Sequence, residues 1–315
     1  MDRVPVILDT DIGTDVDDIV ALGVLLRAPT IDLRAITTVY VNAALRARIV
    51  KTVLAVAERP ALPVGCGADK PLLNRDPLVW EGWEGEGLLR AEDVDAAPLP
   101  HAIDLLTEMV LAHPGEITIL AIGPLTNIAL ALAREPRMAA AVRRIVIMGG
   151  MFQRRFDQLS SPYVEHNIRC DPEAAQIVLA SGAPITLVPL DVTTQVRLRR
   201  DDLRGLRAGG DLAALIADQL ERYMGHKGRD WTNPHDPLTA AAVAQPDLLR
   251  TFPLRVNVET RGEYTRAQTV AVHQRVAERG APAIDVALEV DVARSERWLI
   301  ETLAGSVATA RPAAR

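Results

Sequence analysis

The chain has 315 residues, of which 49% are hydrophobic and 24% charged, with a formal net charge of -6 at pH 7. Acidic and basic residues are interspersed, so the sequence predicts no basic surface for nucleic acid or an anionic membrane. Two cysteines are too few for a disulfide framework, and the N-terminus shows no secretory segment, which together favour a cytoplasmic protein without a membrane span.

Short apolar runs alternate with amphipathic stretches along most of the chain. The predicted strands are Val4 to Leu8, Ile31 to Val39, Pro63 to Gly65, Ile117 to Ile122, Ile145 to Met148, Ile185 to Leu190, Leu254 to Glu259 and Ile284 to Val290. The predicted helices are Val16 to Arg27, Ala43 to Glu58, His101 to His113, a helix after Asn127 that ends at Arg134, Pro172 to Ala180, Asp201 to Arg207, Asp211 to Met224, Leu238 to Ala244 and Val292 to Leu303. Gly67 to Pro100 shows little periodicity, and the tail beyond about residue 305 is expected to fray.

This alternation predicts the α/β class, with an open, mostly parallel twisted sheet that carries helices on both faces around a Rossmann-like core. No internal repeat and no linker divides the sequence, so residues 1–315 are expected to form a single domain. Polar residues stand just after several predicted strands. Because the carboxyl ends of parallel strands meet at one edge of a sheet, we expect these residues to converge on one crevice.

An acidic loop follows the first predicted strand, and it contains Asp9, Asp11, Asp15, Asp17 and Asp18. Five carboxylates within ten residues repel one another unless they are solvated or surround a cation or hydrogen-bond donors. A single aspartate here would need no more explanation than a helix cap, but the whole group favours a metal or polyol site. Because every candidate ligand is an oxygen, Ca²⁺ or Mg²⁺ suits the loop better than zinc.

Further polar segments follow later strands in the same order along the chain. They are Thr37-Thr38 leading to Asn42, Gly123-Pro-Leu-Thr-Asn127, Met148-Gly-Gly150, Glu165-His-Asn167 before Asp171-Pro-Glu-Ala174, and His235-Asp236-Pro237. Together with Asp9-Thr-Asp-Ile-Gly and Asp17-Asp18, these ordered segments resemble the motifs of the inosine-uridine preferring nucleoside hydrolases. The resemblance extends from Val4 to about Leu303.

The resemblance implies a calcium-dependent enzyme that hydrolyses the N-glycosidic bond of ribonucleosides to ribose and free base. The attack by a metal-bound water would pass through an oxocarbenium-like transition state, which the surrounding carboxylates stabilise. The implied calcium ligands are Asp11, Asp18, the backbone carbonyl of Thr126, and Asp236. The implied ribose contacts are Asp17, Asn42 and Asn167, with Glu165 near the 5′ hydroxyl and Met148 on the pocket wall.

Two residues are candidates for proton transfer. Asp11 would take the proton of the attacking water as general base, and His235 is the candidate acid for the departing base because an imidazole titrates near neutral pH. His235 beside Asp236 could equally be a pair at the start of a helix. His166 lies between two implied ribose contacts, so an alternating backbone would point it away from them, and it is left out.

Tryptophans offer surfaces for the nucleobase. Trp80, Trp83 and Trp231 all fall in irregular segments, and a base stacks on such a ring with about 1 to 3 kcal/mol. We predict Trp83 and Trp231 as base contacts, although Trp80 and Trp83 could instead hold a glycine-rich loop on the core.

The sequence departs from the family pattern in four places. Two extra residues separate Gly13 from Asp17, so Asp15 is an additional carboxylate that could replace a metal ligand. Val41 stands where a glycine often precedes Asn42. The loop around Trp83 lacks the histidine of pyrimidine-preferring relatives, and no Gly-Asn pair follows Met148-Gly149-Gly150. The base preference therefore stays open.

Two other function classes compete with this interpretation. In a haloacid-dehalogenase-like phosphatase, Asp9 would be a nucleophile beside Mg²⁺, but that reaction leaves Asn42 and His235 unexplained. A non-catalytic ribose or nucleoside binding protein would keep the metal site without turnover. The resemblance favours the hydrolase, with a small nucleoside substrate and a homodimeric or homotetrameric assembly.

Overall fold

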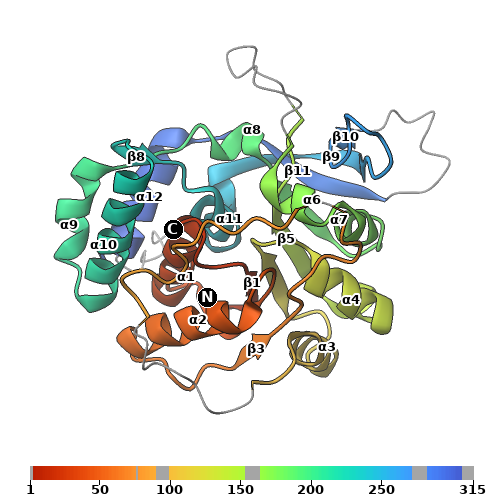
Figure 1. Ribbon diagram of the computed structural model, residues 1–315, viewed down its shortest axis with the longest axis horizontal. Coiled ribbons are helices and arrows are strands. Elements are labelled where there is room, and N and C mark those ends of the chain that lie inside the picture. Colours follow the sequence, from red (N-terminus) through yellow and green to blue (C-terminus); the bar gives the residue numbers. More distant parts are fainter. Residues whose placement is uncertain (1–2, 76, 90–98, 153–163, 272–281, 307–315) are drawn as a thin grey trace, which may run out of the picture.

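The first strand of the chain, β1 (Val4–Thr10), lies inside a nine-stranded sheet, where β4 pairs on one side of it and β2 on the other. The computed structural model (Figure 1) describes residues 3–75, 77–89, 99–152, 164–271 and 282–306. The sheet order is β10-β9-β11-β6-β5-β4-β1-β2-β3. The other strands are β2 (Ile31–Thr38), β3 (Val64–Cys66), β4 (Thr118–Ala121), β5 (Arg144–Met148), β6 (Ile185–Val188), β9 (Leu249–Val258), β10 (Thr269–Ala271) and β11 (Ala283–Val290).

All neighbouring strands from β11 to β3 pair in parallel, and only the edge is antiparallel, where β9 pairs with β11 and β10. The predicted α/β class with a mostly parallel sheet is therefore confirmed. The chain adds β2 and β3 on one side of β1, and later adds β4, β5 and β6 on the other side. The loops after β1 and β4 consequently diverge, and this divergence opens a crevice at their carboxyl ends.

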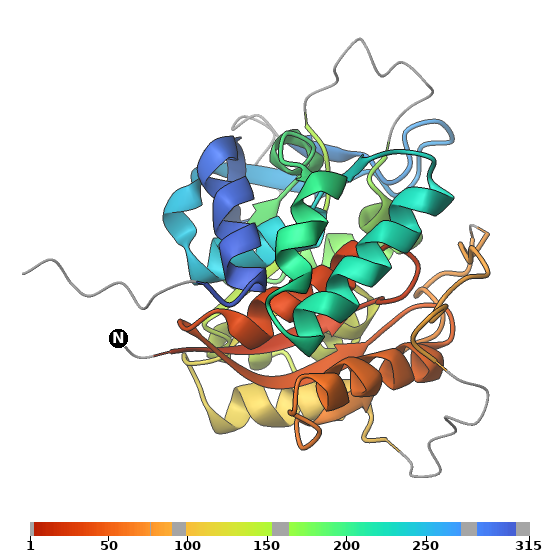
Figure 2. The same ribbon diagram turned by 90° about the vertical axis from the view of Figure 1, so that its left-hand side faces the viewer.

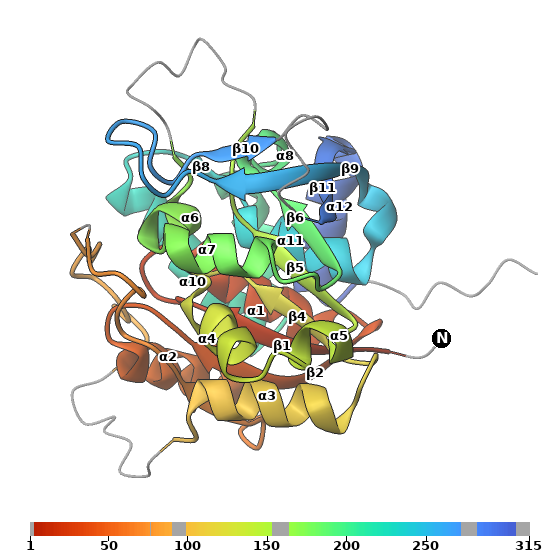
Figure 3. The same ribbon diagram turned by 90° about the vertical axis from the view of Figure 1, so that its right-hand side faces the viewer.

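Helices cover both faces of the sheet, as predicted. One face is covered by helices from both halves of the chain (Figure 2). They are α1 (Asp17–Arg27), α2 (Ala43–Val56), α9 (Leu203–Arg207), α10 (Asp211–His226), α11 (His235–Ala244) and α12 (Val292–Leu303). The opposite face carries α3 (Ala102–Ala112), α4 (Thr126–Arg134), α5 (Met138–Ala141) and α7 (Pro172–Leu179), which Figure 3 shows on the near side. Along β1, Val6 and Leu8 pack into the first core and Ile7 packs into the second, so the strand is apolar on both sides.

The differences from the predicted elements are short segments and boundaries. Several short elements have no periodic signal in the sequence, because they span too few residues for a period. They are α6 (His166–Cys170), α8 (Leu190–Thr193), β10, and the pair β7 (Leu198–Arg199) and β8 (Trp231–Thr232). Helix α11 begins at His235, three residues before the predicted start at Leu238. Pro237 is tolerated there because the first N–H groups of a helix have no partner within it.

Part of the predicted aperiodic stretch from Gly67 to Pro100, and the tail predicted to fray beyond about residue 305, lie outside the described residues. The described part of that stretch contains no helix or strand. In the described portions of the chain, no helix combines the length and the apolar character needed to cross a membrane.

A buried arginine fastens the acidic loop to the turn between β2 and α2. Arg46 of α2 is fully buried, and its guanidinium donates to the carbonyl oxygens of Tyr40 (2.5 Å), Ile12 (3.0 Å) and Asp11. It also donates to the hydroxyl of Thr14 (3.2 Å). Its positive charge therefore stands directly behind the aspartates of the loop.

Replacing this guanidinium should destabilise the fold. Because Arg46→Met removes the donor of several buried carbonyl groups and the cation beside the carboxylates, we expect a loss of about 3 to 5 kcal/mol in the free energy of unfolding. Urea denaturation measures the loss. Arg59→Met is the matched control, because Arg59 is exposed, and it should change stability by less than about 0.5 kcal/mol. Equal stabilities of the two variants would contradict this role of Arg46.

Candidate active site

A cavity of about 260 Å³ opens at the carboxyl ends of the central strands. Many of the predicted site residues line it: Asp11, Asp15, Asp17, Asp18, Met148, Glu165, Asn167, His235 and Asp236. They come from the loop after β1, the start of α1, the end of β5, the start of α6 and the start of α11. The sheet thus brings together residues that are far apart in the sequence.

Three buried aspartates form a group that could hold a metal ion. One carboxylate oxygen from each of Asp17, Asp18 and Asp236 lies within 4.8 Å of the others. Asp17 and Asp18 lie in the first turn of α1, and Asp236 lies in the first turn of α11. The partial positive charge at each helix N-terminus favours carboxylates in these positions. The donor set consists of hard oxygen ligands, which suits Ca²⁺ or Mg²⁺.

The group carries strong internal repulsion. Burial, followed by the charges of Asp15 and Asp18, raises the pKa of Asp17 well above 3.8. Burial, followed by the charges of Asp17 and Asp18, does the same to the pKa of Asp236. The pKa of Asp18 is also raised well above 3.8, chiefly by burial, although a hydrogen bond from the hydroxyl of Thr10 opposes that shift. A cation among these oxygens would relieve both the desolvation and the repulsion.

Asp11 stands at the inner wall of the cavity, beside this group. Its side chain is 7% exposed, and burial raises its pKa while the charge of Arg46 lowers it. Gly123, just after β4, approaches so closely that an added Cβ would lie 2.8 Å from the backbone nitrogen of Asp11. The end of β4 can press against Asp11 only because this position is a glycine.

Asp15, the additional carboxylate of the acidic loop, makes hydrogen bonds outside the metal group. Its Oδ2 accepts a hydrogen bond from the hydroxyl of Tyr223 in α10 (2.6 Å), and its Oδ1 accepts one from the backbone N–H of Val16 (2.6 Å). Asp15 therefore connects the acidic loop with the end of α10. Its charge still acts on the neighbouring carboxylates.

Glu165 and Asn167 line the same cavity and are held in place by hydrogen bonds. Glu165 caps α6 and accepts hydrogen bonds from the backbone N–H groups of Gly150 (3.1 Å), Asn167 (2.8 Å) and Ile168 (3.0 Å). The side-chain amide of Asn167 donates to the carbonyl oxygens of Ile122 (2.8 Å) and Met148 (3.3 Å). These contacts give both side chains a single orientation toward the cavity.

His235, at the start of α11, is half-buried and lines the cavity together with Asp15. The hydroxyl of Thr193 lies 2.7 Å from its Nδ1, so Nε2 is the ring nitrogen left for the cavity. Burial lowers the pKa of His235 to about 4. The ring is consequently neutral at pH 7, which changes the sequence-based argument that it titrates near neutral pH.

Four predicted site residues do not line the cavity: Asn42, Thr126, Trp83 and Trp231. Asn42 is exposed and caps α2 by accepting from the N–H of Leu45 (3.1 Å). The hydroxyl of Thr126, in the first turn of α4, donates to Asp171 (2.7 Å). The ring of Trp231 lies between the guanidinium groups of Arg197 and Arg229, 4.3 Å and 5.0 Å from its centre. These contacts depend on residues from other elements, so the sequence pattern could not have revealed them.

The turn that carries Asn42 is strained. Tyr40, Val41 and Asn42 all have positive φ angles, of 67°, 34° and 61°. A β-branched residue rarely adopts such a conformation, and each such residue costs about 1 to 3 kcal/mol. Val41 occupies the position where the family often has a glycine, so the departure seen in the sequence coincides with backbone strain beside the site.

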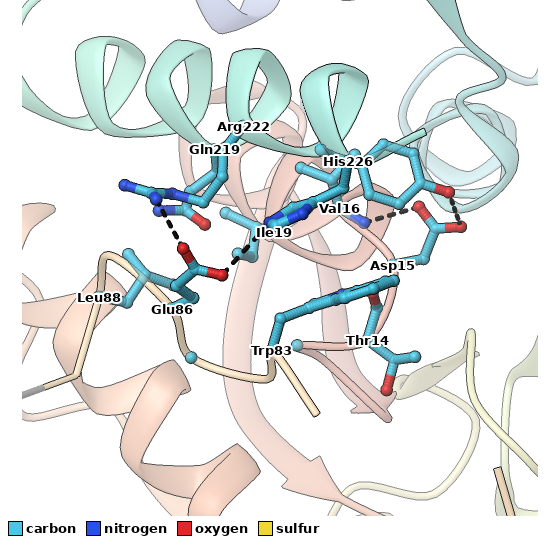
Figure 4. A pocket seen from close by; sticks show the side chains of 13 residues that line it. Thr14, Asp15, Val16, Ile19, Trp83, Glu86, Leu88, Gln219, Arg222 and His226 are labelled. Atoms are coloured by element: carbon cyan, nitrogen blue, oxygen red, sulfur yellow. Dashed lines mark hydrogen bonds and ion pairs between the residues drawn. The ribbon is translucent and has the colours of Figure 1, made fainter. Parts of the chain in front are cut away.

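Trp83 packs in a second, smaller pocket between the acidic loop and α10, as Figure 4 shows. Its ring stacks on His226 with 4.9 Å between centroids, and its Nε1 donates to the carbonyl oxygen of Thr14 (3.0 Å). Glu86 pairs with Arg222 and His226 alongside. Trp83 therefore fastens its loop to the core, which was the alternative to base stacking.

The cavity also has lining residues that the sequence did not single out: Thr14, Val79, Glu81, Ile122, His166, Leu190 and Lys227. The exclusion of His166 was wrong, because it assumed an extended backbone. Residues 166–170 form helix α6, so the alternation of side chains does not apply.

Asp9, the nucleophile required for a phosphatase, is fully buried. It accepts hydrogen bonds from Thr37 (2.5 Å) and Asn127 (2.8 Å), and it is absent from the described residues that line the cavity. Asp9 is thus placed as a structural residue between β1, β2 and α4.

Comparison with known proteins agrees with this geometry. A family model described as inosine-uridine preferring nucleoside hydrolase matches residues 6–297. The chain belongs to this family. It is therefore a ribonucleoside hydrolase, an N-glycosidase that releases ribose and free base, and the sequence-based prediction of family and reaction is confirmed. The family is generally metal-dependent, in keeping with the buried aspartates.

Individual relatives cover nearly the whole nucleoside hydrolase chain. The pyrimidine-specific ribonucleoside hydrolase RihA of Salmonella agona is 35% identical in an alignment of 283 positions that covers 84% of this chain and 88% of that protein. A plant nucleoside hydrolase has a TM-score of 0.84 at 30% identity, covering 96% of this chain and 99% of that one. A purine-preferring ribonucleoside hydrolase from Gardnerella vaginalis also has a TM-score of 0.84, at 27% identity, covering 96% and 100%.

The raised carboxylate pKa values predict how stability depends on pH when no metal is bound. A carboxyl group whose folded pKa is raised contributes stability that is complete below its unfolded pKa and is lost as the pH rises through the folded pKa. The chelated protein should therefore lose stability from about pH 4 upward, and added calcium should restore it. Thermal unfolding with chelator and with calcium measures this effect: the calcium-induced rise in Tm should be larger near pH 8 than near pH 5. Equal rises at both pH values would contradict it.

Proposed function

We propose that this ribonucleoside hydrolase depends on calcium, and that the cavity at the carboxyl ends of the central strands is its active site. The observation that carries the proposal is the buried group Asp17, Asp18 and Asp236 in the same cavity as Asp11 and His235. We further propose that the chain acts as one domain, in a homodimer or homotetramer, in the cytoplasm.

The proposed calcium ligands are Asp11, Asp18, Asp236 and the backbone carbonyl of Thr126. The close approach of Asp17 to Asp18 and Asp236 supports Asp17 as a further ligand, or as a contact to a ribose hydroxyl directly beside the ion. The bonds of Asp15 to Tyr223 and Val16 argue against Asp15 as a ligand. When bound, calcium would supply a positive charge that holds the ribose hydroxyls and makes a neighbouring water more acidic.

The protein's own side chains supply the remaining chemistry. Asp11 takes the proton of the attacking water, a role that its raised pKa suits because a base works best when its pKa is near the operating pH. The carboxylates around the cavity stabilise the positive charge that develops on the ribose. Glu165 and Asn167 orient the 5′ side of the sugar, and Met148 closes the wall beneath it.

His235 acts on the leaving base. Because its ring is neutral at pH 7 and Thr193 occupies Nδ1, we propose that Nε2–H donates to the departing base as negative charge develops there. Trp83 and Trp231 are not proposed as base contacts, since Trp83 packs against His226 and Trp231 lies between two arginines.

The experiment that tests the function is release of free ribose from uridine, cytidine, inosine and adenosine. We expect turnover in calcium and its loss in chelator, with recovery when calcium is added back, because the aspartate group cannot bind ribose hydroxyls well without the ion. p-Nitrophenyl phosphate serves as the rival substrate. Ribose release that survives exhaustive chelation would remove the metal from the proposal, and phosphate release would favour a phosphatase.

A pair of variants separates the two proton-transfer roles. Asp11→Ala should lower kcat by about 10²- to 10⁴-fold on both a nucleoside and p-nitrophenyl riboside, because both reactions need an activated water. His235→Ala should slow only the nucleoside, since p-nitrophenolate departs without protonation. Steady-state kinetics measures both, with the exposed Asp218→Ala as control. Equal losses on both substrates for His235→Ala would show that it does not assist the leaving group.

A further inference from the structure

Lys227 is the one lysine or arginine among the described residues that line the active-site cavity. It follows directly after α10, and the rest of the cavity wall is rich in carboxylates, including Glu81 and Glu165. A lysine ammonium has three donors and no acceptor, so it calls for an electron-rich partner.

The ammonium of Lys227 packs against two aromatic rings and not against a carboxylate. Its Nζ lies 4.9 Å from the ring centre of Trp83 and 5.5 Å from that of Tyr223, which are favourable cation–π distances. None of the ion pairs between described residues involves Lys227. The ring faces attract the positive charge but do not accept conventional hydrogen bonds from it. The N–H groups of the ammonium therefore remain available to a ligand.

Both rings are tied to the acidic loop. Trp83 donates to the carbonyl oxygen of Thr14 (3.0 Å), and Tyr223 donates to the carboxylate of Asp15 (2.6 Å). The acidic loop therefore also holds the two rings against which the ammonium of Lys227, an exposed residue, packs.

Contacts also connect Lys227 with residues of the cavity wall near His235. Its ammonium packs over Tyr223, Tyr223 donates to Asp15, and both Asp15 and His235 line the cavity. In the proposed orientation, with the sugar on the aspartates and the base at His235, Lys227 is the lysine of the described wall that can meet the base.

We propose that Lys227 is the residue through which this chain discriminates between bases, by donating to an exocyclic oxygen that oxo bases carry and their amino counterparts lack. This inference rests on the proposed function of the cavity. Hypoxanthine and uracil carry an oxygen acceptor where adenine and cytosine carry an amino group, which presents its own N–H donors to the ammonium.

The preference arises mainly in the transition state. As the bond from C1′ to the base nitrogen breaks, its electron pair stays with the base, and the water oxygen bonds to C1′. One water proton remains on the new hydroxyl, and the other finally resides on the released base. In an oxo base the developing negative charge spreads onto the exocyclic oxygen, so a hydrogen bond from an ammonium strengthens as the reaction proceeds.

The test compares inosine with adenosine, and uridine with cytidine, in the wild type and in Lys227→Met. The ratio of kcat/KM for the oxo nucleoside to that for the amino nucleoside should fall by about 10- to 100-fold, the range for a hydrogen bond to a charged group, and mostly through kcat. Lys227→Arg should retain most of the ratio because it keeps a charged donor. Lys70→Met, an exposed lysine remote from the described cavity wall, should leave every ratio unchanged.

Each alternative outcome overturns the inference in a distinct way. An unchanged ratio in Lys227→Met means that the lysine does not contact the exocyclic group. An equal fall for all four nucleosides, with an unchanged Tm, means a general role in binding or access. If the wild type releases no ribose from any of the four, the proposed function of the cavity fails and this inference fails with it.

Discussion

Repulsion among buried carboxylates is the constraint on which the rest of this structure depends. Carboxylate oxygens of Asp17, Asp18 and Asp236 lie within 4.8 Å of one another, and Asp11 and Asp15 are nearby. Burial disfavours the charged forms and so raises the pKa of Asp17 and of Asp236. The two helix N-termini and the buried guanidinium of Arg46 supply positive potential that opposes this repulsion. The hydroxyl of Thr10 adds a hydrogen bond to Asp18. A divalent cation would complete this compensation, and the same geometry that is unfavourable for the protein alone would then serve as its binding site.

The sheet order explains why these groups meet. β1 lies between β2 and β4, and the chain extends the sheet first on one side and then on the other. Loops that leave the carboxyl ends of the central strands therefore diverge and leave room for a ligand, while the helices α1 and α11 bring their first turns to the same place. The apolar strands carry no chemistry themselves, but their register determines the separation of the polar residues that follow them.

Sequence alone was sufficient for the α/β class, the parallel sheet, most long elements and the family, because these depend on periodicity and on ordered motifs. It also identified most residues that line the cavity. It failed where a contact depends on another element: Trp83 meets His226, Asn42 caps its own helix, and Lys227 is held by rings from two segments. His166 was missed because a helix of five residues leaves no periodic signal, and the pKa of His235 depends on burial that no motif encodes.

The metal group also has a consequence for the order of events during synthesis. The backbone N–H of Asp236 bonds to the carboxylate of Asp17 across a separation of 219 residues. A nascent chain that has already exposed Asp11, Asp17 and Asp18 must wait for most of the protein before it acquires Asp236. Closing so long a loop is slow, and the acidic loop lacks a ligand until it closes. We therefore expect ion capture to be a late step, because it requires the chain through β6 and into α11, whereas β9, β10 and β11 of the sheet follow Asp236.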